Sequence, residues 1–195
     1  MSFIAGMVAT FLQKDFLPDC EVLRGVPEEK LEQLGDLLTT AMPDFDARSA
    51  VATLLFRSTR DGATAAFHKR CDYKGPTLVL IKDTDGNVFG GYTQKNWSSK
   101  WTHVSDTAAF LISVVSPHGT PPVLFPSTGG NYSIGCDSMC GPIFGDGVVL
   151  GGFMGDLCFT RNSGREYVNP TGRRAEEVMT GRLNFRPAIV EVYSL

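Results

Sequence analysis

The chain contains no apolar run long enough to span a bilayer, which requires about 20 residues. The apolar stretch near its N-terminus has about half that length, and no basic residue precedes it, so it is a poor signal peptide. An excess of basic residues is missing too. The net charge is −3, which argues against general nucleic-acid binding because nucleic-acid binders are usually basic. Internal repeats and low-complexity tracts are also absent.

A paired set of cysteines is likewise lacking. The five cysteines form an odd number without a regular framework, so a secreted domain held together by disulfides is not indicated. Reduced thiols predict a cytoplasmic protein. The cysteines stand at Cys20, Cys71, Cys136, Cys140 and Cys158.

The composition that is present belongs to an ordinary globular protein. With 195 residues, 43% hydrophobic and 20% charged, the chain is long enough for one domain with a sizeable core and a helical attachment. Charge is uneven: residues 1–50 hold 4 basic and 9 acidic groups, whereas residues 51–195 hold 14 and 12. We therefore divide the chain into an acidic helical arm, residues 1–49, and a β-rich domain, residues 50–195.

Two helices are expected in the arm. The first follows Ser2 and ends at Pro18, and its apolar side is formed by Ile4, Val8, Phe11 and Leu12. The second begins at Pro27 and has one apolar stripe of Leu31, Leu34, Leu37 and Leu38. An isolated helix of this length is marginal in water, so we expect the stripe to pack on the β domain. A docking helix for another protein is the alternative.

Short β-rich runs divided by Gly and Pro predict the fold of the rest. We expect a mainly β protein with peripheral helices (α+β), built as a β-sandwich, with Phe89 and Phe110 buried on strand faces. Helical stretches are expected over residues 61–71 and 174–179. Strands are expected at 51–56, 77–81, 87–93, 108–115, 123–125, 132–134, 148–150, 157–160 and 188–195.

Several local patterns resemble chemical sites, but a structural explanation is favoured for each. Asp83-Thr-Asp-Gly-Asn87 resembles the start of a calcium loop, yet it lies between strands and suits a tight hairpin turn. Cys136 and Cys140 form only half of a zinc site. Cys71 with His68 is a conceivable nucleophile pair among many accidental pairings. The glycine-rich stretches 90–91 and 141–147 lack the features of a phosphate loop.

No catalytic, cofactor-binding or metal-binding residue is therefore assigned, and no cofactor is expected. Trp97 and Trp101 leave two interpretations open. They anchor a loop on the core, which we favour, or they belong to a binding surface.

Over residues 50–195, ordered runs of the sequence resemble the TLDc domain family. They include Leu54–Gly62, Lys74–Lys82, the most specific run Gly86–Thr93, and Glu191-Val-Tyr193 near the end. The residues that carry the resemblance are Asp61, Gly62, Gly75, Pro76, Phe89, Gly90, Gly91, Tyr92, Trp97, Gly141, Pro142, Phe144, Gly145 and Glu191.

The resemblance implies a eukaryotic, non-catalytic protein-interaction or regulatory module, folded as a two-sheet antiparallel β-sandwich of TLDc type. It implies a protein partner, with peripheral subunits of the V-ATPase as the candidate, or a role in oxidative-stress protection. It brings no catalytic residues. Two other hypotheses stay open: a thiol-dependent enzyme, which needs an exposed cysteine of low pKa, and a structural or self-associating domain.

Overall fold

The protein is described from a computed structural model, which covers residue 12 and residues 16–42, 51–150, 158–160 and 165–195. The helix expected after Ser2, with Ile4, Val8 and Phe11, lies outside these residues. None of the helices within the described ranges is long and apolar enough to cross a membrane.

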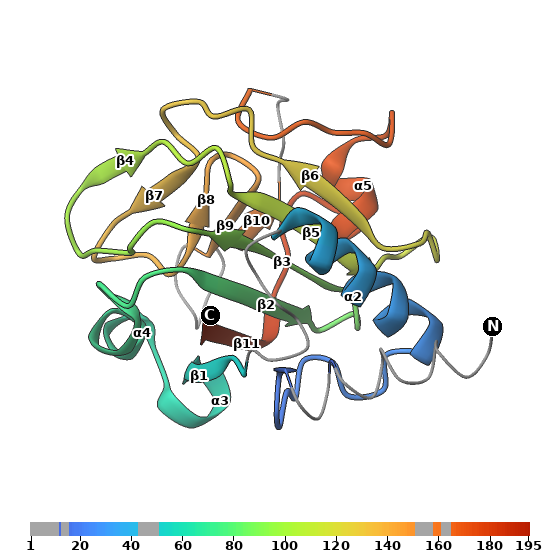
Figure 1. Cartoon of the computed structure of the whole chain (residues 1–195), viewed down its shortest axis with the longest axis horizontal. Coiled ribbons are helices and arrows are strands. Elements are labelled where there is room, and N and C mark those ends of the chain that lie inside the picture. Colours follow the sequence, from blue (N-terminus) through green and yellow to red (C-terminus); the bar gives the residue numbers. More distant parts are fainter. Residues whose placement is uncertain (1–11, 13–15, 43–50, 151–157, 161–164) are drawn as a thin grey trace.

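Six of the described strands form the larger sheet, in the order β1-β11-β2-β3-β5-β6 (Figure 1). Every neighbouring pair is antiparallel, and the last strand of the chain, β11, lies between β1 and β2. The strands are β1 (Thr53–Arg57), β2 (Thr77–Asp83), β3 (Val88–Thr93), β5 (Phe110–Val115), β6 (Val123–Pro126) and β11 (Pro187–Ser194).

Five shorter strands of the described chain form a second antiparallel sheet, in the order β10-β9-β8-β7-β4. Its outer strands are β10 and β4. The strands are β4 (Thr102–Val104), β7 (Ile134–Cys136), β8 (Ile143–Phe144), β9 (Val148–Leu150) and β10 (Cys158–Thr160).

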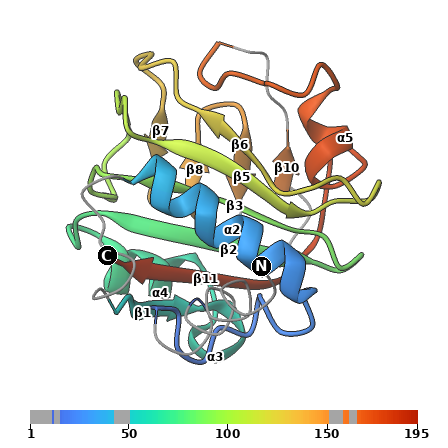
Figure 2. The ribbon, with the colours of Figure 1, turned by 45° about the vertical axis from the view of Figure 1, so that its right-hand side comes forward.

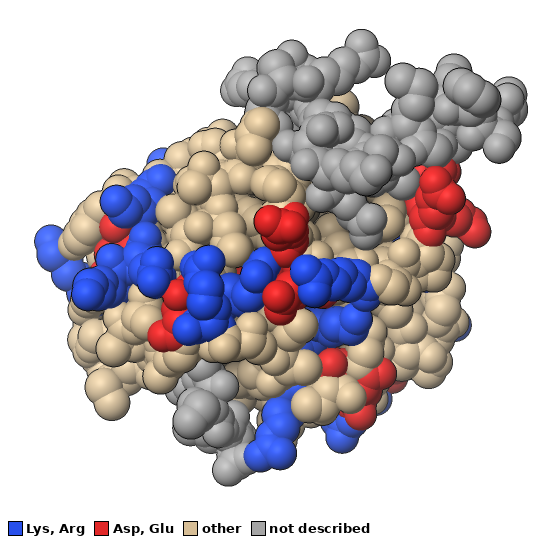
Figure 3. Space-filling model, turned by 90° about the horizontal axis from the view of Figure 1, so that it is seen from below, with Lys and Arg blue, Asp and Glu red and all other residues tan. Residues whose placement is uncertain are grey.

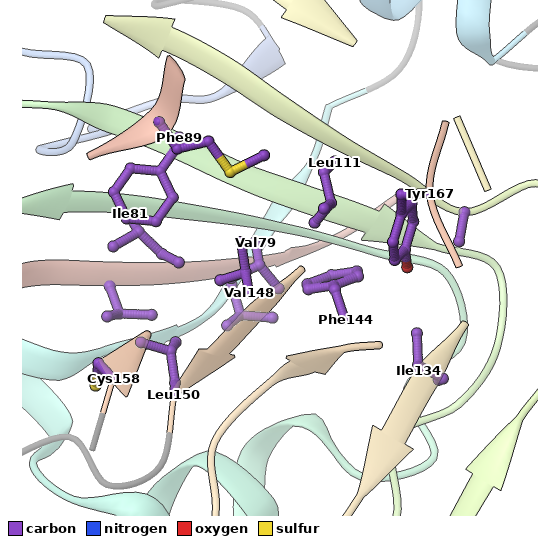
Figure 4. Close-up of a cluster of buried hydrophobic side chains, with 14 of the residues drawn as sticks. Val79, Ile81, Phe89, Leu111, Ile134, Phe144, Val148, Leu150, Cys158 and Tyr167 are labelled. Atoms are coloured by element: carbon purple, nitrogen blue, oxygen red, sulfur yellow. The ribbon is translucent and has the colours of Figure 1, made fainter. Parts of the chain in front are cut away.

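The main core lies between the two sheets. Figure 4 shows Val79, Ile81, Phe89 and Leu111 of the larger sheet facing side chains of the second sheet, among them Phe144. All of these side chains are fully buried. Alternate residues of a strand point to opposite faces of the sheet. Val79 and Ile81, two positions apart on β2, therefore both point into this core. The expected two-sheet antiparallel sandwich is thereby confirmed, and so is the burial of Phe89.

The other face of the larger sheet carries a second apolar cluster. It contains Leu78, Leu80 and Phe110, which is also buried as expected. Helix α2 (Glu28–Ala41) covers this cluster and lies across β2, β3 and β5 (Figure 2). The larger sheet is thus buried on both faces, which explains why β2 and β3 read as nearly continuous apolar runs.

The apolar stripe of α2 packs as the sequence predicts. Leu31, Leu34 and Leu38 are buried against the sheet, whereas Leu37 is only partly buried at its border. The helix begins one residue after Pro27, whose extended backbone precedes the first turn. Packing of the stripe on the β domain is confirmed, and the docking-helix alternative is wrong for these residues.

Three short helices complete the described structure: α3 (Ser58–Asp61), α4 (Thr64–Cys71) and α5 (Ala175–Met179). The helix expected over residues 61–71 is interrupted at Gly62, whose φ of +90° suits glycine and ends α3. Phe67 of α4 is buried and contacts the rings of Phe56 and Trp97 edge to face. Helix α4 therefore closes one end of the main core.

Two strands were not expected from the sequence, β4 and β8. They have three and two residues, and the exposed residues Thr102 and His103 of β4 show no apolar alternation. Such strands are defined by a neighbour in the sheet rather than by their own pattern. The partner of β4 is β7, with Thr102 opposite Cys136.

Packing of α2 leads to a prediction. Leu34→Ala should lower the free energy of unfolding by about 2–5 kcal/mol, because it removes a fully buried side chain and leaves a cavity between α2 and the sheet. Leu37→Ala is the matched control and should cost clearly less, since Leu37 is only partly buried. Urea unfolding followed by circular dichroism measures both. Equal losses for the two variants would contradict the packing described.

Candidate functional site

A carboxylate lies fully buried in the larger sheet, where strand β11 carries Glu191. Three side chains donate hydrogen bonds to it. Arg57 Nε lies 2.6 Å from Oε1, and Cys20 Sγ and the Tyr193 hydroxyl each lie 3.0 Å from Oε2. The guanidinium of Arg57 balances the buried charge, which is a condition for keeping a carboxylate ionised away from water.

The same network holds the segment before α2 against the sheet. The backbone N–H groups of Glu21 and Val22 donate to Glu191 over 3.1 and 3.3 Å. Arg57 also donates to the Glu21 carboxylate, at 3.2 Å, and to the Asp19 carbonyl, at 2.5 Å. Glu191 and Arg57 together therefore connect the two ends of the described chain.

The chemistry of this network is structural rather than nucleophilic. Burial, together with the charge of Glu191, raises the pKa of Cys20 to about 12, so the thiol stays protonated and acts as a donor. Burial also raises the pKa of Tyr193. The Cys20 thiol and the Tyr193 hydroxyl stabilise the carboxylate in their neutral forms. Neither is deprotonated at neutral pH, as a nucleophile would need to be.

A second polar network surrounds His68 on α4. Its Nδ1 lies 2.9 Å from Asp72 Oδ1, and its Nε2 lies 3.0 and 2.9 Å from the carbonyl oxygens of Asp137 and Cys140. Ser99 Oγ donates to the other oxygen of Asp72, at 2.7 Å. His68 thereby ties the end of α4 to the loop that follows β7.

This arrangement differs from the Cys71–His68 nucleophile pair considered from the sequence. Both nitrogens of His68 are engaged by oxygen atoms of other residues. Cys71 is fully buried, and burial raises the pKa of its thiol to about 12. A nucleophilic cysteine needs the opposite shift, toward the thiolate at neutral pH.

The remaining cysteines show no sign of a metal site. Burial raises the pKa of both Cys136 and Cys140, and all five cysteines of the chain are free thiols. Among the described residues, no group of three or more His, Cys, Asp or Glu side chains is placed to hold a metal ion.

The calcium-like pattern forms the expected hairpin turn between β2 and β3. Asp83 Oδ1 accepts the N–H groups of Asp85 and Asn87, at 3.0 and 2.8 Å, and its Oδ2 accepts the amide of Asn87, at 2.8 Å. Both oxygens of this carboxylate therefore stabilise the turn.

Two glycines of the family pattern, both in β3, allow close packing. A Cβ atom at Gly90 would lie 2.0 Å from the carbonyl oxygen of Val79 on the neighbouring strand. A Cβ atom at Gly91 would lie 2.9 Å from the ring of Phe144 in the opposite sheet. Only glycine fits at these positions, so the pattern reflects close packing within the larger sheet at Gly90 and against the second sheet at Gly91, rather than a phosphate loop.

The two tryptophans have different roles. Trp97 is buried, donates from Nε1 to Thr77 Oγ1 over 2.8 Å, and packs edge to face on Phe67 and Phe144. It anchors a loop on the core, which is the interpretation we favoured. Trp101 is 79% exposed and makes no such anchor.

The other residues of the pattern occupy core positions, turns and strand ends. Phe89 packs on Phe185, and Tyr92 stacks on Phe110. Asp61 ends α3, and its carboxylate is 3% exposed. Turns or positions beside short strands are occupied by Gly62, Gly75, Pro76, Gly141, Pro142 and Gly145.

Large apolar and aromatic side chains are exposed around the outer strand β4. They are Trp101 (79% exposed), Met139 (71%), Tyr73 (63%) and Tyr132 (53%). His103 of β4 is exposed as well, and its ring packs against that of Tyr132, with centroids 4.6 Å apart. We call these five residues the aromatic surface.

Hydrogen bonds connect the segments that carry Tyr73, Trp101 and Met139. The N–H of Tyr73 donates to the Trp97 carbonyl, at 3.1 Å, so the end of α4 lies against the loop that leads to Trp101. Strand β4 begins immediately after Trp101, and its first residue, Thr102, is opposite Cys136 of β7. Met139 follows Cys136 by three residues, so its loop starts close to Trp101. The sequence indicated a binding surface only through Trp97 and Trp101, because the other members of the aromatic surface come from separate segments.

A shallow cavity of about 240 Å³ adjoins this surface. It is lined by the edge-to-face pair His103 and Tyr132 and by the charged residues Asp146, Arg165 and Glu166. Glu166 Oε2 accepts a hydrogen bond from the N–H of Tyr132, at 3.2 Å. This charged residue of the cavity therefore also holds the backbone of the aromatic surface in place.

Comparisons with known proteins fit this structure. A sequence model of the TLDc domain matches residues 28–195. The chain is also similar to curated proteins named MTOR-associated protein MEAK7. Identity is 43% over 44 residues for the protein of Danio rerio, which covers 23% of this chain and 10% of that protein. The protein of Gallus gallus is 41% identical over 64 residues, which cover 31% of this chain and 13% of that protein. The protein of Xenopus laevis is 38% identical over 64 residues, which cover 31% of this chain and 14% of that protein. The matched stretch is thus a small part of those proteins.

The buried carboxylate gives a prediction. Glu191→Gln should lower the free energy of unfolding by about 3–5 kcal/mol, because an amide N–H₂ replaces an acceptor and Arg57 loses its fully buried charged partner, keeping only the more exposed Glu21. Glu177→Gln is the control, since Glu177 also pairs with an arginine, Arg174, but at the surface. Urea unfolding should show no change for it. Equal stability of the Glu191→Gln variant and the wild-type chain would contradict the assigned role.

Thiol reactivity gives a second prediction. Cys140 should react first with iodoacetamide at pH 7.5, since it is partly exposed whereas the other four cysteines are buried. The other four should react at least about tenfold more slowly. Because the pKa of Cys140 is raised, its rate should still increase with pH above the ordinary thiol range. Peptide mass spectrometry identifies the modified site, and Cys140→Ser should abolish the first modification. Faster labelling of Cys71 would revive the thiol-enzyme hypothesis.

Proposed function

Because this chain belongs to the TLDc domain family, we propose that it is a non-catalytic regulatory module that binds a protein partner through the aromatic surface. The candidate partner is a peripheral subunit of the V-ATPase. The proposal rests on one observation: five exposed side chains, three of them Trp or Tyr, stand on segments that are joined to strand β4 and to the loop before it.

The composition of this surface supports the proposal. Tyr, Trp and Met are enriched in protein interfaces, and Trp and Tyr are frequent among the few residues that carry most of the binding energy. Exposing such side chains to water has a free-energy cost that burial against a partner would recover. Trp101 has the most to gain, at 79% exposure.

The placement of the reactive groups supports a non-catalytic module. The described thiols that could serve a nucleophilic reaction have raised pKa values, and the carboxylates Glu191 and Asp83 accept hydrogen bonds that hold the fold. A contribution to oxidative-stress protection would then depend on the partner that the module binds, rather than on its own thiols.

A second candidate partner comes from the relatives. Their names describe them as associated with mTOR, and they share 34–43% identity with part of this chain. Association with an mTOR-containing assembly is therefore the runner-up to V-ATPase binding.

Binding experiments test the proposal directly. The full chain should bind the purified peripheral sector of the V-ATPase, as measured by biolayer interferometry. Trp101→Ala should weaken that binding about tenfold or more, as truncation of a central interface residue does. Leu183→Ala is the control. Leu183 is 47% exposed and lies beside β10, at the opposite edge of the same sheet.

The outcome separates the two partners. Binding to a purified mTOR complex but not to the V-ATPase sector, with the same loss for Trp101→Ala, would favour the runner-up. Equal binding by the Trp101→Ala and wild-type chains would remove the aromatic surface from the proposal.

A further inference from the structure

Two arginines share one carboxylate on the lower face of the molecule. Arg60 of α3 donates from Nε to Asp61 Oδ1, at 2.9 Å, and from Nη2 to Oδ2, at 2.7 Å. Arg70 of α4 places its Nη2 3.0 Å from Asp61 Oδ1. One carboxylate thus holds two guanidinium groups that come from different helices.

The carboxylate itself has a fixed position. The side chain of Asp61 is only 3% exposed, and it also accepts the backbone N–H of Arg57, at 2.9 Å. The hydrogen bond from Arg60 and the neighbouring positive charges lower the pKa of Asp61, so it stays ionised at neutral pH. Asp61 therefore acts as a rigid support for both arginines.

The arginines keep part of their hydrogen-bonding capacity. Each of their side chains is 47% exposed. Arg60 uses Nε and Nη2 for Asp61, so the two N–H groups of Nη1 are left for a ligand. A guanidinium group suits oxygen anions because its planar donors match both oxygens of a carboxylate. Two such groups held together lose less conformational freedom on binding than two free arginines.

The surroundings are basic but not uniformly so. Figure 3 shows a band of Lys and Arg side chains across this face, with acidic groups between them. Lys69 is exposed beside Arg70, and residues 57–74 hold five basic and two acidic groups. Anionic membranes are bound by clusters of four to eight basic residues. Five lies within that range, but the acidic groups in the band would also face the negative membrane surface, whereas a peptide can place its carboxylates on the arginines alone. The band therefore fits a partner protein with an acidic segment better.

We infer that Arg60 and Arg70, positioned by Asp61, form a binding site for carboxylate side chains in an acidic segment of a partner protein. The inference deepens the proposed function and rests on it for the partner. Tyr73 makes the two regions continuous, because this member of the aromatic surface lies two residues beyond the end of α4, the helix that carries Arg70.

A defined probe tests the site without the partner. Fluorescence anisotropy measures binding of fluorescein-labelled octaglutamate to the full chain in 0.1 M salt. Arg60→Gln/Arg70→Gln should weaken binding about tenfold. Arg173→Gln/Arg174→Gln is the matched control, since it removes two exposed arginines near α5, one of them also paired with carboxylates. It should change binding less than about twofold.

The support by Asp61 has its own test. Asp61→Asn makes the chain more positive, so attraction by net charge alone predicts tighter binding of octaglutamate. Positioning by Asp61 predicts weaker binding, about threefold or more, because the arginines lose their common anchor. Circular dichroism and urea unfolding confirm that the variants are folded. Tighter binding by the Asp61→Asn variant would overturn the positioning role.

Further outcomes decide between ligand classes. Equal losses for the Arg60/Arg70 and Arg173/Arg174 double variants would overturn the site. Binding of phosphatidylserine vesicles that is lost in the Arg60/Arg70 variant would also overturn it. The same holds if inorganic phosphate competes at a lower concentration than unlabelled octaglutamate does and this competition is lost in the variant. The Trp101→Ala variant separates the two proposals. It should lose V-ATPase binding but keep octaglutamate binding, so failure of the arginine site and failure of the proposed function give different results.

Discussion

The buried carboxylate of Glu191 is the constraint on which much of the described structure depends. A charge in the interior is tolerated only when donors and an opposite charge surround it, and the donors here come from three separate segments. Strand β1 supplies Arg57, the segment before α2 supplies Cys20 and two backbone N–H groups, and β11 supplies Tyr193. The chain ends must therefore meet before Glu191 can be buried.

Burial of the larger sheet on both faces follows the same logic. One face packs on the second sheet through residues such as Phe144, and the other packs under α2 through residues such as Leu34. Segment 19–22, fastened by Glu191, directs the chain toward the start of α2. The helix before the β domain is therefore packed as part of the same structure, and the TLDc match accordingly begins at residue 28.

The surfaces proposed for binding lie where this framework ends. Trp101 and His103 stand at the outer strand of the smaller sheet, whereas Arg60 and Arg70 stand on the short helices that follow β1. Their supports are nevertheless buried or well bonded: Trp97 anchors the loop before Trp101, and Asp61 anchors both arginines. Rigid supports under exposed side chains lower the entropic cost of binding.

Local patterns of the sequence determined the strands of the larger sheet, the hairpin at Asp83 and the packing stripe of α2, because apolar periodicity and turn residues act over a few neighbouring positions. The ordered family runs added the two antiparallel sheets of the sandwich and the module class. Only the tertiary structure decided that β4 and β8 are strands, that Trp97 is buried while Trp101 is exposed, and that Glu191 meets Arg57 and Cys20. These features depend on contacts between residues up to 171 positions apart, which no local pattern encodes.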